Sequence, residues 1–283
     1  MSKEEEDVGV LEALLLGKEY SHEDATGFWS DWGAKGINWC EEDYVHTEFV
    51  AELWNTLSNL AFVAAGVAGW RMTTQLKLPR RFYGLSLAII GLGITSGAFH
   101  GTLLWINQKL DETFENASLV YLFHSDKASD VIPLVHSLIV LAGAFTITFF
   151  LFCELHLIGS VLVTLVKVRQ WSQLADKVTD GKAGLNGAVR TCAVSVAMGA
   201  ICWLIDRLAC KQVSQLAFNP QLHAWWHILC GISLYEGFVL AAALHNFQQA
   251  LELPSFDVKS LPLPLIKSTN YGFHYPETIK LKT

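Results

Sequence analysis

The chain has 283 residues, of which 52% are apolar, and its formal net charge is -7. This balance excludes a strongly basic surface of the kind that binds nucleic acids, so no nucleic-acid partner is expected. Acidic residues crowd the first fifty positions, whereas long central stretches have almost no charge. A helix needs about 20 predominantly apolar residues to cross a bilayer, and several stretches meet that need. We therefore expect an all-α integral membrane protein.

Residues 1–46 are polar, aromatic and rich in turn formers, and we expect them to form an N-terminal arm and a small cap. The first predicted span covers about residues 49–70. Its first half carries Glu52, Asn55, Ser58 and Asn59. Polar groups in a membrane helix face the bundle interior or a cavity, so one side of this helix is expected to face a functional site. Because the first residues are acidic, we expect no signal peptide before it and expect this span to direct insertion.

Six further apolar stretches complete a predicted bundle of seven transmembrane helices. They cover about residues 82–104, 110–124, 131–152, 155–168, 188–209 and 223–244. The membrane domain is therefore expected at residues 47–246. Residues 247–283 contain prolines and no periodic apolar face, and we expect a flexible tail there.

The distribution of basic residues predicts the orientation of the bundle. Lysine and arginine concentrate in cytoplasmic segments of membrane proteins. With seven spans and a lumenal N-terminus, most of the 20 lysine and arginine residues fall on the cytoplasmic side. We therefore expect a lumenal cap and a cytoplasmic C-terminus.

Three histidines are expected to meet at one depth of this bundle. His223 and His227 lie four residues apart at the lumenal start of the seventh span, so they share a helix face. His100 lies at the lumenal end of the second span, four residues after Ser96, and Asp111 begins the third span on the same side. Two imidazoles at this spacing bind a metal ion from one helix.

This set of residues predicts a hydrolytic zinc site. Three histidines and one open position are typical of catalytic zinc, which activates a water molecule near neutral pH. We expect Asp111 to transfer the proton and the Ser96 hydroxyl to stabilise an oxyanion. The reaction is then hydrolysis of an amide or ester, and a site walled by membrane helices suggests a lipid substrate. Each residue also has a structural alternative: histidines and the Trp225–Trp226 pair occur at membrane interfaces, and Ser96 can bond its own backbone.

At the level of motifs, the chain resembles the alkaline ceramidases from about residue 27 to residue 244. The resemblance rests on these segments: Asn38-Trp39-Cys40-Glu41-Glu42-Asp43-Tyr44, Ala51-Glu52-Leu53-Trp54-Asn55-Thr56, Ser96 to His100, Leu110-Asp111-Glu112, Trp203 with Ile205-Asp206, and Gln221 to Leu229. It implies a seven-helix membrane amidase that cleaves ceramide into a sphingoid base and a fatty acid. It also implies zinc held by His100, His223 and His227, with Asp111 and Ser96 as acid/base and oxyanion partner. The expected location is the endoplasmic reticulum or the Golgi, and no obligate protein partner is evident.

The resemblance further implies a calcium site in the cap. Its ligands would be Asn38, the backbone carbonyl of Trp39, Glu41, Asp43 and Glu52, and such hard oxygen ligands suit calcium. The family usually has aspartate where this chain has Asn38 and asparagine where it has Asp43. The formal charge of the set is unchanged, so we expect calcium binding to be retained with altered affinity.

The same resemblance implies a disulfide between Cys40 and Cys210. The predicted topology places both on the lumenal side, where an oxidising compartment permits the bond. Cys153 also lies near that face, so this pairing is a prediction. The remaining cysteines are expected to be buried small residues.

Two other functions are compatible with parts of this pattern. One is a seven-helix receptor or lipid sensor that holds zinc and has weak or no hydrolase activity. The acidic and aromatic motif from Trp39 to Asp43 and the predicted lumenal N-terminus favour the ceramidase instead. The other is a metal transporter, which would need ionisable residues through the depth of the bilayer, whereas these lie in one layer.

Overall fold

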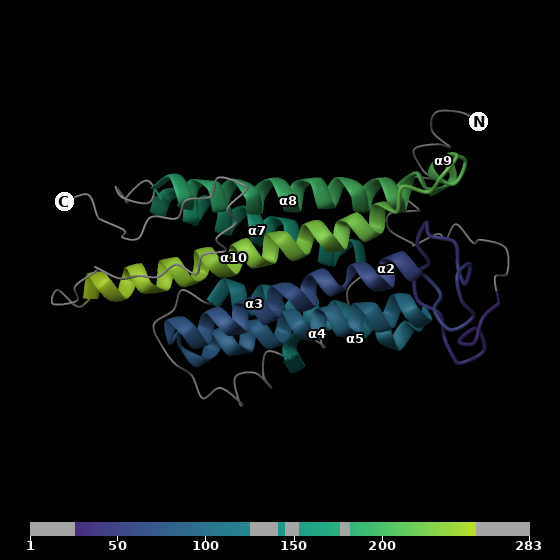
Figure 1. Ribbon diagram of the computed structural model, residues 1–283, viewed down its shortest axis with the longest axis horizontal. Coiled ribbons are helices and arrows are strands. Elements are labelled where there is room, and N and C mark those ends of the chain that lie inside the picture. The colour runs from purple at the N-terminus through teal and green to yellow at the C-terminus, as the bar shows by residue number, and fades with distance from the viewer. Residues whose placement is uncertain (1–25, 125–140, 145–152, 176–181, 253–283) are drawn as a thin grey trace.

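The computed structural model describes residues 26–124, 141–144, 153–175 and 182–252. Helices dominate this part of the chain. They are α2 (Leu53–Ser58), α3 (Leu60–Leu76), α4 (Arg80–Thr102), α5 (Trp105–His124), α7 (Cys153–Ala175), α8 (Lys182–Leu208), α9 (Cys210–Val213) and α10 (Leu222–Glu252). Figure 1 shows the long helices running along the long axis of one bundle, with residues 26–52 and α9 at the same end.

Three of the described helices are long and apolar enough to cross a membrane. They comprise Arg80–Thr102, Leu185–Leu208 and Leu222–Asn246. At 17 residues, α3 is shorter than a typical span, and α5 and α7 carry charged residues within their length. The expected all-helical architecture is therefore confirmed for the described residues, and three of these helices could cross a membrane, whereas the number of seven spans stays a prediction. The predicted fourth span at 131–152 lies mostly outside the described residues, as do residues 1–25 of the arm and 253–283 of the tail.

Two predicted helices begin at other positions than expected. Helix α2 begins at Leu53 rather than near residue 49, because the preceding backbone bonds to the end of α4. The amide nitrogens of Ala51 and Glu52 donate to the carbonyl oxygens of Gly101 and His100, both at 3.0 Å. Helix α5 begins at Trp105 rather than near residue 110. Its first turns carry a buried ion pair that satisfies the charges of Lys109 and Glu112, which lie 2.7 Å apart.

The core of the bundle is formed by buried side chains of α3, α4, α5, α7, α8 and α10. Phe82, Leu85 and Phe238 are completely buried there. Helices α3 and α4 approach closely at Gly66, where an added Cβ would lie 2.6 Å from the Ile90 side chain. Small residues at such crossings are typical of membrane helices, which pack without a hydrophobic driving force between them.

The cap, residues 26–52, contains no regular helix and packs on the junction between α4 and α5. The amide of Gly36 donates to the carbonyl of Leu103, and the amide of Trp105 donates to the carbonyl of Ala34, both at 2.8 Å. These bonds satisfy backbone groups at the end of one helix and the start of the next. The cap is therefore held over the end of the bundle at which the predicted site residues lie.

Candidate metal centre and active site

His100, His223 and His227 come together in the interior of the bundle. Each has at most 3% of its surface exposed. One ligand atom from each lies within 4.8 Å of the others. Within the part of the chain that the structure describes, no other group of three histidine, cysteine or acidic side chains converges as tightly.

Two of the three imidazoles are oriented through their Nδ1 atoms. The Nδ1 atom of His100 is hydrogen-bonded to the Glu52 carboxylate, and the Nδ1 atom of His227 lies 2.8 Å from the Ser58 hydroxyl. Both rings therefore have Nε2 available for a metal. Partners of this kind fix the ring orientation of a ligating histidine and raise its basicity.

His223 is held by stacking instead. Its ring lies 3.7 Å from that of Trp39, with 22° between the two planes. Its Nδ1 atom is buried and has no hydrogen-bond partner. Burying a polar atom without a partner is costly, and imidazole nitrogens are typical zinc ligands. The donor set therefore fits zinc.

Asp111 and Ser96 lie beside the histidines. Both line the same cavity as the three imidazoles, and their side chains are hydrogen-bonded to each other. The Ser96 hydroxyl donates to the carboxylate and so positions it. The structure thus brings together all five residues that the sequence predicted for this layer, while their chemical roles remain predictions.

The cavity that these residues share has a volume of about 110 Å³. Apolar side chains make up much of its wall, including Phe62, Leu92, Val196 and Leu234. A mostly apolar cavity with a few convergent polar groups is the usual form of a small-molecule site. The arrangement suits a substrate with a polar reacting group and an apolar body.

The residues predicted to bind calcium lie next to this centre, in the cap and at the start of α2. The Asn38 amide donates to the Asp43 carboxylate at 2.9 Å. Glu41 accepts the backbone amides of Trp54 and Asn55 at 2.7 and 2.8 Å. The pKa of Glu41 is raised to about 7, chiefly by burial and to a smaller extent by the nearby carboxylates of Glu52 and Asp43, while the two amides act in the opposite direction.

Two features of this acidic set fit a hard cation. The side-chain oxygen of Asn38 is buried and has no hydrogen-bond partner. The Glu41 carboxylate interacts unfavourably with those of Glu52 and Asp43, and a bound cation would offset this repulsion. The side-chain atoms that would bind the cation are all oxygens, which calcium prefers as ligands.

Glu52 belongs to both sets. It is completely buried, and its Oε1 atom accepts the backbone amide of Trp39 at 3.0 Å. Its Oε2 atom contacts His100 and accepts the Asn55 side-chain amide at 3.1 Å. The cap and the histidine centre therefore share one carboxylate.

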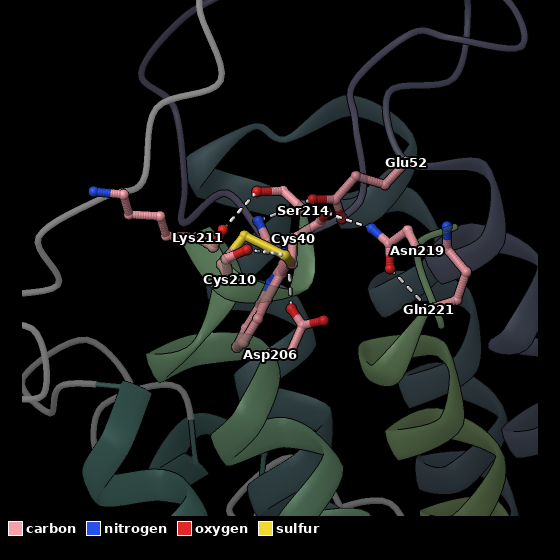
Figure 2. The surroundings of a disulfide bond; sticks show 9 residues. Cys40, Glu52, Asp206, Cys210, Lys211, Ser214, Asn219 and Gln221 are labelled. Carbon is pink, nitrogen blue, oxygen red and sulfur yellow. Dashed lines mark hydrogen bonds between the residues drawn. A yellow bond between two sulfur atoms is a disulfide. The ribbon is translucent and has the colours of Figure 1, made fainter. Parts of the chain in front are cut away.

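A disulfide between Cys40 and Cys210 connects the cap to α9, with 5.2 Å between the Cα atoms (Figure 2). The amide of Cys40 donates to the buried Asp206 carboxylate at 3.0 Å, and the Asn219 side chain donates to the Cys40 carbonyl at 2.7 Å. Both backbone groups of Cys40 are thus satisfied. This network fixes the chain immediately after Trp39, whose ring contacts His223.

Sequence reasoning missed the supports of the histidines. It predicted that Glu52, Asn55, Ser58 and Asn59 would face a functional site. Of these, Glu52, Asn55 and Asn59 are buried. It did not predict the contact between Ser58 and His227 or the stacking of the Trp39 ring on His223. The polar run in an apolar segment was the available signal, but such a run does not indicate which histidine each side chain contacts.

Comparison with known proteins identifies the family. A sequence model of the ceramidase family matches residues 34–264, which is more than half of the chain. The chain belongs to the alkaline ceramidase family. It is 30% identical to alkaline ceramidase 3 of Mus musculus over 226 residues, covering 75% of this chain and 84% of that protein. It is 28% identical to an alkaline ceramidase of Arabidopsis thaliana over 221 residues, covering 75% of this chain and 85% of the relative. The chain is also 27% identical to an alkaline ceramidase of Saccharomyces cerevisiae over 249 residues, covering 76% of this chain and 78% of that protein.

Proposed function

We propose that this protein hydrolyses the amide bond of ceramides and releases a sphingoid base and a fatty acid. The observation that carries the proposal is the buried group of three histidines beside Asp111, at the wall of an apolar cavity, in a chain of the ceramidase family. Ceramide has a polar amide between two long apolar chains, which matches the composition of this wall.

We propose zinc as the metal at His100, His223 and His227. Zinc held by three histidines supplies a Lewis acid and an activated water at neutral pH. Glu52, Ser58 and Trp39 hold the three rings, so the ligand geometry is set before a substrate enters. Preorganisation of this kind avoids reorganisation during the reaction.

Asp111 is proposed as the acid/base residue. Its carboxylate lines the cavity next to the histidines, where it can accept a proton from the attacking water and return it to the leaving nitrogen. The Ser96 hydroxyl is hydrogen-bonded to this carboxyl group. Rotation of its hydroxyl toward a substrate carbonyl would supply the predicted oxyanion donor.

We further propose calcium at Asn38, Trp39, Glu41, Asp43 and Glu52. Because Glu52 also contacts His100, ordering of the cap by a cation would stabilise the histidine centre. We propose that this end of the bundle faces the lumen of the endoplasmic reticulum or the Golgi. The Cys40–Cys210 disulfide and the distribution of basic residues support that orientation.

The test is replacement of Asp111 by Asn in the full-length protein. Loss of a positioned acid/base group is expected to lower ceramide turnover by about 100-fold or more, while zinc content measured by elemental analysis stays the same. Asp31→Asn, the same change at an exposed position of the cap, is the matched control and should retain activity. Full turnover in Asp111→Asn would overturn the proposed role.

A further inference from the structure

The cap carries a group of aromatic side chains on its surface, which we call the aromatic cluster. Its members are Phe28, Trp29, Trp32 and Phe49. The centroid of the Phe28 ring lies 4.8, 5.4 and 5.5 Å from those of the other three. Phe28, Trp32 and Phe49 are 46%, 62% and 54% exposed. Contiguous apolar surface of this kind marks an interaction site rather than a chance exposure of single residues.

Hydrogen bonds within the cap hold the aromatic cluster together. The indole nitrogen of Trp29 donates to the carbonyl of Phe49 at 2.8 Å. The amide of Phe28 donates to the carbonyl of Glu48, also at 2.8 Å. These bonds join two segments of the cap that lie about 20 residues apart in the chain, so the rings form one preformed surface.

The backbone on either side of the aromatic cluster is fixed to one end of the bundle. Helix α4, which is long and apolar enough to cross a membrane, ends there at Thr102. The amide of Trp105 donates to the carbonyl of Ala34 at 2.8 Å, and the amide of Ala51 donates to the carbonyl of Gly101 at 3.0 Å. Both cap segments are therefore attached at the level where α4 ends.

This attachment limits how far the rings can lie from a membrane surface. Trp32 precedes Ala34 by two residues, and Phe49 precedes Ala51 by two residues. Two residues of extended chain span at most about 7 Å. Apolar side chains of interfacial segments lie about 5–10 Å deep at the boundary between headgroups and acyl chains. The aromatic cluster is therefore within reach of that boundary.

The helices that follow the cap have a wholly apolar exposed face. Only Asn59 separates α2 from α3, and between residues 53 and 70 the exposed positions recur every three or four residues. They are Trp54, Leu57, Leu60, Ala64, Val67 and Trp70. At a rise of about 1.5 Å per residue this stripe is about 24 Å long, which approaches the thickness of the hydrocarbon core of a bilayer. Tryptophan stands at both of its ends, and this residue is enriched at membrane interfaces.

The aromatic cluster continues this stripe at the end where the cap lies. The His46 ring of the cap contacts the Trp54 ring, with 6.1 Å between the centroids. Phe49 precedes Trp54 by only five residues, and Figure 1 shows the cap extending from the start of α2. Continuity with a lipid-facing stripe indicates that the bilayer covers the aromatic cluster.

The charge of the cap indicates which lipids are suited to this contact. Within residues 26–52 the only lysine or arginine is Lys35, whereas six residues are acidic. Anionic lipids are attracted by groups of basic residues, so the cap has no electrostatic preference for them. Burial of the rings is then the main contribution, and a zwitterionic surface is sufficient.

We propose that the aromatic cluster inserts into the interfacial layer of the leaflet beside the cap and fastens the cap to the membrane. The ligand is the zwitterionic lipid surface itself. Because the cap also supplies residues that contact His100 and His223, this anchor would help to keep the candidate metal centre ordered. The inference does not depend on which reaction the centre catalyses.

Fluorescence quenching tests the insertion, with full-length protein in phosphatidylcholine nanodiscs. The emission of Trp32 is the difference between the unmodified protein and Trp32→Phe, which keeps an aromatic ring. Bromine atoms quench tryptophan only at close range. Lipids brominated near the headgroup should therefore remove most of the Trp32 emission, and lipids brominated at the chain ends should remove little. Trp171→Phe provides the control, because Trp171 is buried in the core and its emission should respond to neither lipid.

The opposite result is equally clear. Emission of Trp32 that is unchanged in both brominated lipids would overturn the proposal. Iodide in the water then distinguishes the reason: quenching by iodide shows that the ring faces water, and protection from iodide shows that a protein surface covers it. Both results exclude insertion into the bilayer.

Hydrogen exchange tests whether insertion fastens the cap. In nanodiscs, Trp32→Ser should exchange the amides around Gly36 several-fold faster than the unmodified protein, because the cap opens more often. Trp32→Phe should restore slow exchange. Asp31→Ser, at the exposed neighbouring position outside the aromatic cluster, is the matched control and should exchange like the unmodified protein. Equal exchange in Trp32→Ser and the unmodified protein would contradict the anchoring role.

Discussion

The carboxylate of Glu52 contacts the Nδ1 atom of His100, and the same carboxylate accepts the backbone amide of Trp39. Trp39 in turn stacks on His223. Two of the three histidines are therefore positioned by residues at the base of the cap. The cap therefore supplies residues that orient the histidines of the candidate metal centre.

Replacing Glu52 by Gln should weaken zinc binding by about 10- to 100-fold, because the amide keeps the shape of the side chain but loses the charge that orients His100 and raises its basicity. Competitive titration with a chromogenic chelator measures the affinity. Glu42→Gln makes the same change at an exposed position of the cap and should have no effect. Equal affinities for both variants would show that Glu52 does not support the site.

Ser58→Ala should weaken zinc binding less, by about 10-fold, because it removes a neutral partner of His227 rather than a charged one. The same titration measures the loss. Ser214→Ala is the matched control, since its exposed hydroxyl bonds only to the nearby carbonyl of Lys211 among the described contacts. A loss as large as that in Glu52→Gln would contradict the ranking of the two supports.

Calcium affinity should rise with pH through the neutral range. The pKa of Glu41 is about 7, so the carboxyl is mostly protonated at pH 6 and mostly ionised at pH 8. Calcium requires the ionised form and therefore competes with the proton. Calorimetric titration at the two pH values should show tighter binding at pH 8, and Glu41→Gln should remove most of this dependence. Affinity that is independent of pH would exclude Glu41 as a ligand.

Removing the disulfide should destabilise the cap without removing the metal ligands. Cys40→Ser is expected to lower the free energy of unfolding by about 2–4 kcal/mol, because the bond closes a long loop. The melting temperature in detergent should fall accordingly. Cys202→Ser, at a free cysteine, should change it little. An unchanged melting temperature in Cys40→Ser would show that the hydrogen bonds of the residue-40 backbone with the Asp206 carboxylate and the Asn219 side chain suffice to hold the cap.

The sequence was sufficient to predict which histidines meet, for a physical reason. His223 and His227 share a helix face by spacing, and the length of membrane helices places His100 at the same depth. Contacts made by the irregular cap follow no such period. Glu52 reaches His100 because the backbone amides of residues 51 and 52 donate hydrogen bonds to the end of α4. Hydropathy carries no information about such a contact. The start of α5 at Trp105 was missed because Lys109 and Glu112, which neutralise each other, lower the apparent hydropathy of its first turns.

The central claim is zinc-dependent cleavage of ceramide, and one measurement tests it most directly. Purified full-length protein is incubated with ceramides, and released sphingoid base is quantified before zinc chelation, after chelation, and after zinc or calcium is added back. We expect release that chelation abolishes and that zinc restores, whereas calcium alone does not. Release that persists after complete removal of zinc would contradict the metal assignment. No release from any ceramide with zinc bound would contradict the enzyme and favour a zinc-containing receptor or lipid sensor.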